Sequence, residues 1–175
     1  MDPERCDACG FDGSDFDTGS LLAALRELGP RWRTTLAGSG DQLRLRPAPA
    51  VWSAIEYAAH SRDITALHVF GVEQALTIDE PAFDAIEGDD LIQSAAATYD
   101  GADADEVVVA LDSEANHLAD LAERAGSAAW SRGLTVGDSR MDVRRLLEHA
   151  LHDSRHHLDD VERGLGTLRA RDGES

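Results

Sequence analysis

The stretch RMDVRRLLEHALHDSRHHLDDVERG, which spans residues 140–164, decides the fold. Its apolar side chains recur at intervals of three and four residues, which is the spacing of one face of an α-helix. We therefore predict a helix from Arg140 to about Gly164, with Asp138 or Ser139 as its N-cap. Such a helix has to bury its apolar face against other elements of the fold.

Periodicity of the same kind recurs in the preceding part of the chain. It predicts helices over about residues 18–36, 49–76 and 103–125, and a short helix over residues 89–98. Pro30 lies inside the first of these patterns, where it is expected to bend or split the helix.

Length and composition indicate one helical domain. The 175 residues suit a single core, and 42% of them are hydrophobic whereas only 5% are aromatic, which favours helices over a β-sandwich. We predict an all-α, antiparallel four-helix bundle over residues 18–166, with a loop over residues 126–139 between the last two helices. Residues 1–17 are expected to form an irregular arm and residues 167–175 a disordered tail.

The chain is strongly acidic. It has 34 acidic and 16 basic side chains, which gives a formal net charge of −18. Such a surface repels phosphate backbones and anionic membranes, so we expect neither nucleic acid nor a membrane as a partner. The first residues lack the basic and apolar regions of a signal peptide, and no apolar run approaches the roughly 18 residues of a membrane span. The cytoplasm is the predicted compartment.

Histidine is concentrated in the last predicted helix, which holds His149, His152, His156 and His157. Side chains four residues apart lie one above the other on a helix, so two of them can present ligands to one metal ion. A third ligand has to come from another helix, and His60 in the second predicted helix is the best donor.

Helical phase separates the side chains of this cluster. With about 100° of rotation per residue, Asp153 and His157 lie about 60–100° from the centre of the apolar face, whereas His152 and His156 lie nearly opposite. We therefore predict a metal site formed by His60, Asp153 and His157. The pair His152 and His156, which would face solvent or a second subunit of a homodimer, stays open as the alternative.

Two motifs carry a family resemblance. The first is WSAIEYAAHSRD, which begins at Trp52 and in which Glu56 and Asp63 share the helix face of His60, so that either carboxylate could orient the imidazole. The second is HALHDSRHHLDDV, residues 149–161. In order and spacing these motifs resemble the DinB-like superfamily, which also includes the mycothiol-dependent maleylpyruvate isomerase family.

The resemblance covers about residues 18–166 and implies a four-helix bundle with a metal held by one residue of the second helix and two of the last. It aligns Asp153 and His157 with the two ligands of the last helix, although the family motif often has histidine at the position of Asp153. The implied cofactor is a divalent metal, with zinc expected first and nickel and manganese as alternatives.

The function that the resemblance implies is that of a metal-dependent enzyme acting on a small molecule. A thiol S-transferase or isomerase that uses a metal-activated thiolate, with a low-molecular-weight thiol such as mycothiol as cosubstrate, is the first expectation. A metal-dependent hydrolase on the same site and a non-enzymatic metal-binding or interaction module are the alternatives. The sequence identifies no catalytic residue.

The predicted N-terminal arm contains both cysteines of the chain, Cys6 and Cys9, in a C-x2-C-G knuckle. This spacing suits half of a tetrathiolate zinc site, so the pair is a candidate second metal site that would need histidine or carboxylate ligands, or a second chain, to complete it. Two free thiols in an irregular arm are the alternative.

Overall fold

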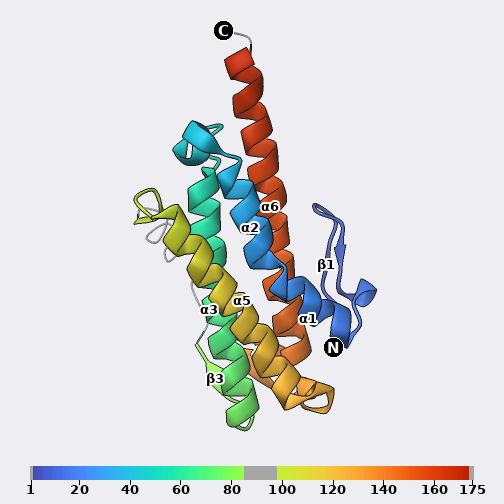
Figure 1. Cartoon of the computed structure of the whole chain (residues 1–175). Coiled ribbons are helices and arrows are strands. Elements are labelled where there is room, and N and C mark those ends of the chain that lie inside the picture. Colours follow the sequence, from blue (N-terminus) through green and yellow to red (C-terminus); the bar gives the residue numbers. More distant parts are fainter. Residues whose placement is uncertain (1, 85–97, 174–175) are drawn as a thin grey trace.

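The computed structural model describes residues 2–84 and 98–173. It confirms the predicted all-α four-helix bundle (Figure 1). The α-helices are α1 (Thr18–Arg26), α2 (Leu28–Ala37), α3 (Ala54–Thr77), α5 (Ala104–Ala125) and α6 (Val143–Gly173). Short 3-10 helices cover Gly13–Asp15, Gly40–Arg44 and Ser127–Ser131. Residues 89–97 of the predicted short helix lie outside the described residues.

The four helices of the bundle are α1 and α2 taken together, α3, α5 and α6. The α1–α2 pair packs on α5 and α6, and α3 packs on the same two helices. In Figure 1, α1, α2 and α6 run upward, whereas α3 and α5 run downward. Helices α3 and α6 are therefore antiparallel neighbours, and residues about a hundred positions apart in sequence meet at their interface.

Local sequence fixes the helix boundaries near this interface. At the start of α3, Ser53 and Glu56 form a capping box, in which the Glu56 carboxylate accepts a hydrogen bond from the Ser53 N–H at 2.8 Å. The first helix splits at Glu27, as the position of Pro30 predicted, because proline has no N–H to donate and is tolerated in the first turn of a new helix.

The connector 126–139, predicted to be a loop, instead contains part of a small sheet. Strands β4 (Gly133–Val136) and β5 (Ser139–Asp142) form an antiparallel hairpin, and β3 (Ala82–Phe83) pairs with β4 in parallel. Gly137 has a φ of +57° in the two-residue turn between β4 and β5, where glycine is favoured. This sheet lies at the end of the bundle where α3 ends and α6 begins.

Helix α6 differs from its prediction at both ends. It begins at Val143 rather than at Arg140, because the hairpin runs through Asp142 and the carboxylate of that residue caps the helix. It continues through Gly173, so the part of the predicted disordered tail that the structure describes is helical.

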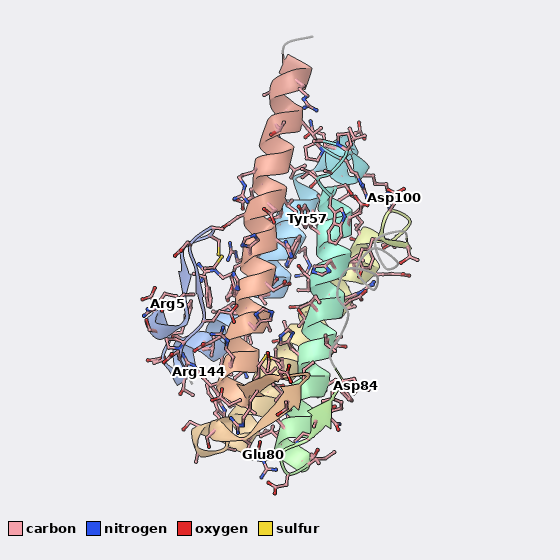
Figure 2. All side chains as sticks on the ribbon, turned by 180° about the vertical axis from the view of Figure 1, so that it is seen from behind. Arg5, Tyr57, Glu80, Asp84, Asp100 and Arg144 are labelled. Carbon is pink, nitrogen blue, oxygen red and sulfur yellow. The ribbon has the colours of Figure 1, made fainter. Side chains whose placement is uncertain are left out.

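The N-terminal arm, expected to be irregular, forms a hairpin of β1 (Arg5–Cys6) and β2 (Phe11–Asp12). Figure 2 shows this arm beside α6, with Arg144 at its base. The guanidinium of Arg144 donates hydrogen bonds to two carbonyl oxygens of the arm, at 2.9 and 2.7 Å. The arm is therefore docked on the helix that carries the histidine cluster.

The core fills the space between the helices with Leu, Val and Ala side chains and the fully buried Trp32. The indole N–H of Trp32 donates a hydrogen bond to Oγ of Ser154 at 2.8 Å, which links α2 to α6 and satisfies both buried polar groups. Among residues 2–84 and 98–173, no helix combines the length and apolar character that crossing a membrane requires.

Candidate metal centre

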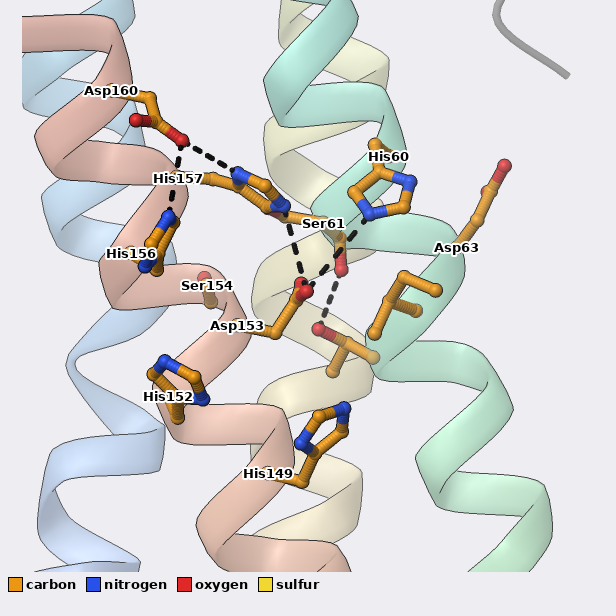
Figure 3. Close-up of polar contacts among 12 residues, drawn as sticks. His60, Ser61, Asp63, His149, His152, Asp153, Ser154, His156, His157 and Asp160 are labelled. Atoms are coloured by element: carbon orange, nitrogen blue, oxygen red, sulfur yellow. Dashed lines mark hydrogen bonds and ion pairs between the residues drawn. The ribbon is translucent and has the colours of Figure 1, made fainter. Parts of the chain in front are cut away.

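One histidine of α3 and two side chains of α6 converge between the two helices (Figure 3). Nε2 of His60 lies 3.9 Å from Oδ1 of Asp153, and Nε2 of His157 lies 3.5 Å from the same oxygen. One donor atom of each residue lies within 4.8 Å of those of the other two. The structure thus brings together the three predicted ligands, whereas metal binding by them stays a prediction.

Aromatic rings pack on both imidazoles of this cluster. The ring centroid of Trp52 lies 5.3 Å from that of His60, and the centroid of Tyr57 lies 5.0 Å from that of His157. The histidine side chains are only 10% and 18% exposed. This packing restricts the rotation of the rings and holds their donor nitrogens near Asp153.

Burial and charge set the protonation of the three side chains. Burial lowers the pKa of His60, against the opposing charge of Asp153, so this imidazole is held neutral, as a metal ligand must be. Burial alone would raise the pKa of Asp153, but interactions with His157 and His60 lower it below its usual value. Burial also acts to lower the pKa of His157, but Asp153 and Asp160 outweigh it and raise that pKa.

The donor set fits a divalent metal ion. Oδ2 of Asp153 is buried and has no hydrogen-bond partner among the described residues, although buried carboxylate oxygens normally have one. Nδ1 of His157 lies 3.1 Å from Oδ2 of Asp160, a hydrogen bond that leaves Nε2 available as a ligand. Two imidazoles and a carboxylate suit zinc, nickel or manganese, and three protein ligands leave coordination positions open.

Neither carboxylate that was expected to orient His60 hydrogen bonds to it in the described structure. Glu56 accepts hydrogen bonds from the helix cap and from Nε of Arg46, the latter at 2.9 Å. Asp63 accepts one from the hydroxyl of Tyr99 at 2.9 Å. Helix spacing placed both carboxylates correctly but could not reveal the partners that other segments bring to them.

The alternative pair, His152 and His156, faces the N-terminal arm rather than solvent or a second subunit. Nδ1 of His156 lies 3.8 Å from Sγ of Cys6, and the ring of His152 packs on Phe11 with 5.1 Å between centroids. Their side chains are 16% and 29% exposed. Helical phase therefore separated the two pairs correctly, but what covers the outer pair was not predicted.

Cys6 and Cys9 lie in the hairpin of the arm, beside these two histidines, and neither is in a disulfide. The backbone N–H groups of Cys9 and Ala8 lower the pKa of the Cys6 thiol, because they stabilise its thiolate. Burial raises the pKa of the Cys9 thiol. The hairpin backbone thus stabilises the thiolate of one of the two cysteines.

An apolar cavity of about 370 Å³ opens beside Asp153, one of the three candidate ligands, between α3, α6 and the small sheet. Asp153 forms part of its wall, together with His68 and His149, two histidines that were not predicted to belong to the site. Gly71 lies inside α3 and, having no side chain, leaves part of this space free. A glycine within a predicted helix was the feature of the sequence that could have indicated the cavity. The remaining lining residues are Ile64, Leu67, Phe70, Phe83, Leu134, Val136, Met141 and Leu146.

The two histidines of the cavity wall differ in protonation. Burial lowers the pKa of His68 to about 4, and its Nδ1 lies 2.7 Å from the carbonyl oxygen of Ile64. Nδ1 of His149 lies 2.8 Å from Oε1 of Glu4 in the arm, and this hydrogen bond raises the pKa of His149. One wall histidine is therefore neutral, and the other is paired with a carboxylate.

The family model of the DinB superfamily matches residues 18–161. The chain belongs to the DinB superfamily. In this DinB protein the matched region contains all three candidate ligands and excludes the arm with its two cysteines. No curated protein matches the chain in sequence.

Two solved structures share the fold of this DinB protein. YfiT from Bacillus subtilis, described as a probable metal-dependent hydrolase with an unusual four-helix bundle topology, is 16% identical with a TM-score of 0.74; the match covers 84% of this chain and 85% of YfiT. A mycothiol-dependent maleylpyruvate isomerase is 13% identical with a TM-score of 0.63, and the match covers 85% of this chain and 62% of the isomerase. At these identities the similarity shows the fold alone.

Proposed function

We propose that this DinB-superfamily protein is a divalent-metal-dependent enzyme, with His60, Asp153 and His157 as ligands, that transfers a low-molecular-weight thiol to an apolar small molecule or isomerises such a molecule with the thiol's help. The observation that carries the proposal is the position of Asp153. This residue belongs both to the ligand cluster and to the wall of the cavity. A substrate held in the cavity would therefore lie next to Asp153 and to an ion bound there.

The lining of the cavity indicates the substrate class. Apart from Asp153, His68 and His149, the lining residues that the structure describes are apolar. No Lys or Arg is among these described residues, so a phosphate or carboxylate group would have no guanidinium or ammonium partner there. The volume suits a small molecule, and burial of its apolar surface would drive binding.

A divalent metal with open coordination positions can bind a thiol and lower its pKa. His60 and His157 would then fix the ligand geometry, because aromatic packing already restricts both rings. The apolar wall would exclude water and preserve a reactive thiolate. His149, which is hydrogen bonded to Glu4 and lies on the same wall, would accept the proton that the thiol loses.

Both structural relatives support metal-linked or thiol-linked chemistry for this fold. The isomerase depends on mycothiol according to its description, and YfiT is described as a probable metal-dependent hydrolase. These descriptions apply to the isomerase and to YfiT. They are the reason why a thiol and water are the two nucleophiles considered for this protein.

Hydrolysis is the second candidate, because the pair of His149 and Glu4 could also accept a proton from water. An imidazole paired with a carboxylate is a common general base toward water, and this pair has 2.8 Å between Nδ1 and Oε1. The same pair could serve either nucleophile. The two candidates therefore differ in whether a thiol or water is bound at the ligand cluster.

Cobalt substitution separates the two candidates, because a thiolate bound to cobalt gives a charge-transfer absorption. The experiment uses the Cys6→Ser/Cys9→Ser variant, so that the protein's own thiols cannot contribute this absorption. We expect mycothiol to produce a saturable sulfur-to-cobalt absorption that His60→Ala abolishes and that His117→Ala, a change at an exposed position of α5, preserves.

The possible failures of this experiment have distinct meanings. If the cobalt-loaded protein binds one ion per chain but does not respond to thiols, the transferase proposal is wrong and hydrolysis remains. If His60→Ala leaves metal binding unchanged, the ligand assignment is wrong and neither enzymatic proposal stands.

A further inference from the structure

The hairpin of the N-terminal arm presents both thiols of the chain on one short turn. Cys6 pairs with Phe11 in the β1–β2 ladder, so the turn between the strands contains Cys9 and Gly10. The N–H of Gly10 donates a hydrogen bond to the carbonyl oxygen of Cys6 at 2.9 Å, and Gly10 has a φ of +70°, which favours glycine. This turn fixes the two cysteines near one another.

Helix α6 supplies two histidines to the same place. His152 and His156 are one turn apart on the helix, and one donor atom of each lies within 4.8 Å of the sulfur atoms of Cys6 and Cys9. The sequence spacing C-x2-C followed by H-x3-H is that of zinc sites with two cysteine and two histidine ligands. Four donors of the right types are therefore gathered from two segments nearly 150 residues apart.

His152 carries an independent indication of a missing ligand. Its Nδ1 lies 2.5 Å from Oε1 of Glu4, so this nitrogen is already occupied. Its Nε2 is buried and has no hydrogen-bond partner among the described residues. A buried imidazole nitrogen without a partner costs free energy, and a metal ion would satisfy it.

In each of the two histidines, one ring nitrogen faces the cysteines and the other nitrogen lies near a carboxylate. For His152 the carboxylate is that of Glu4. For His156, whose Nδ1 faces Cys6, it is that of Asp160, with 3.7 Å between Oδ2 and Nε2. Metal-bound histidines usually have such a carboxylate or carbonyl partner, which orients the ring and strengthens the ligand.

We propose that Cys6, Cys9, His152 and His156 form a second, structural metal site for a tetrahedral ion such as zinc. Two thiolates balance the charge of a divalent ion, and four protein ligands leave no position open for a substrate. This site is separate from the cluster of His60, and the proposal does not depend on the proposed function.

The site would attach the N-terminal arm to α6. In its absence the arm is held by polar contacts such as the hydrogen bond from the Glu4 N–H to Oε2 of Glu148, at 2.9 Å. Glu4 also contacts His149 on the cavity wall, so the bound ion would help to keep the partner of that histidine in place. The second ion would thus stabilise one wall of the cavity without taking part in chemistry.

The test is metal content and cobalt absorption of the full chain, purified under reducing conditions. We expect two equivalents of metal in the wild type. The Cys6→Ser/Cys9→Ser and His156→Ala variants should each retain one equivalent and lose the sulfur-to-cobalt absorption. His60→Ala should lose the other equivalent and keep the absorption, because its cluster contains no sulfur.

His149→Ala is the matched control for metal content. His149 lies three residues from His152 and contacts the same Glu4 oxygen, but it is not a ligand in the proposed site. This variant should keep both equivalents. If it loses the second ion while His156→Ala keeps it, the ion is bound by Glu4, His149 and His152, whose donor atoms also lie within 4.8 Å of one another, and the proposal is wrong.

A measurement on the unmodified protein guards against variants that fail to fold. Zinc should protect Cys6 and Cys9 from alkylation by iodoacetamide, and a chelator should restore their reactivity. Equal alkylation with and without zinc would overturn the proposal, as would a wild type with reduced thiols that gives no sulfur-to-cobalt absorption.

Discussion

Asp160 accepts a hydrogen bond from His157, with 3.1 Å between Oδ2 and Nδ1. The same oxygen lies 3.7 Å from Nε2 of the neighbouring His156. One carboxylate therefore contacts a proposed ligand of each metal site (Figure 3). We expect Asp160→Asn to weaken metal binding at both sites, by about 10–100-fold in affinity, because the imidazoles lose the charge that orients them.

Competition titrations with a chromophoric chelator, performed on the wild type and on Asp160→Asn, measure both affinities. Glu162→Gln is the matched control, because it removes an exposed carboxylate only two residues away, in the same turn of α6. A loss of affinity at only one site would show that the carboxylate supports that site alone.

Gly71 controls the volume of the apolar cavity. A Cβ atom at this position would lie 3.4 Å from Leu134 and 3.6 Å from Leu146, which is close to ordinary contact. Gly71→Ala should therefore fold and gain up to about 1 kcal/mol from helix propensity. Gly71→Leu should fill the cavity and abolish binding of an apolar fluorescent dye, while cobalt content stays unchanged. Unchanged dye affinity in Gly71→Leu would place the dye site elsewhere.

Arg46 compensates a buried charge at the start of α3. The Glu56 side chain is only 3% exposed and hydrogen bonds to the guanidinium of Arg46. Burial alone would raise the pKa of Glu56, but Arg46 and the cap hold it below its usual value. Arg46→Met leaves this carboxylate buried without its cation, so we expect a loss of about 2–4 kcal/mol in the free energy of unfolding.

Urea denaturation measures this loss, and Arg62→Met provides the comparison. Arg62 pairs with Asp63 at 2.7 Å, but the Asp63 side chain is 45% exposed, so the change should cost no more than about 1 kcal/mol. Equal losses in the two variants would mean that burial of Glu56 does not determine the strength of its ion pair.

The fold and the convergence of the three candidate ligands could be predicted because both depend on helical periodicity. Helix α6 is continuous through its histidines, so about 100° of rotation per residue was enough to separate Asp153 and His157 from His152 and His156. His60 was selected on α3 because Glu56 and Asp63 share its helix face at spacings of four and three residues. These are local relationships along single helices.

What the sequence did not reveal depends on contacts between distant segments. The contact between Cys6 and His156 joins residues 150 positions apart, and no local pattern indicates that the arm docks on α6. The pairing of β3 with β4 likewise joins separate parts of the chain, and each strand is too short to give an alternating pattern. The cavity forms only where these elements meet.

His68 should make stability depend on pH. Its pKa is about 4 in the folded protein and 6.5 when unperturbed, so between these values the unfolded chain binds more protons. Stability is therefore lost as pH falls from 6.5 to 4, by up to about 3 kcal/mol. Charged and titratable groups that act on His68 are His149 and Asp153 of α6 and Glu4 of the arm, and all three remain in the test variant.

Subtracting the curve of His68→Gln from that of the wild type isolates this contribution, because the other titrating groups are common to both proteins. The free energy of unfolding is measured from pH 4 to 8 with a chelator present, so that metal release does not contribute. We expect the difference between the two proteins to change by a few kcal/mol below pH 6.5 and to be constant above pH 7. Parallel curves over the whole range would show that the imidazole of His68 is hydrated or changes its environment when it is protonated.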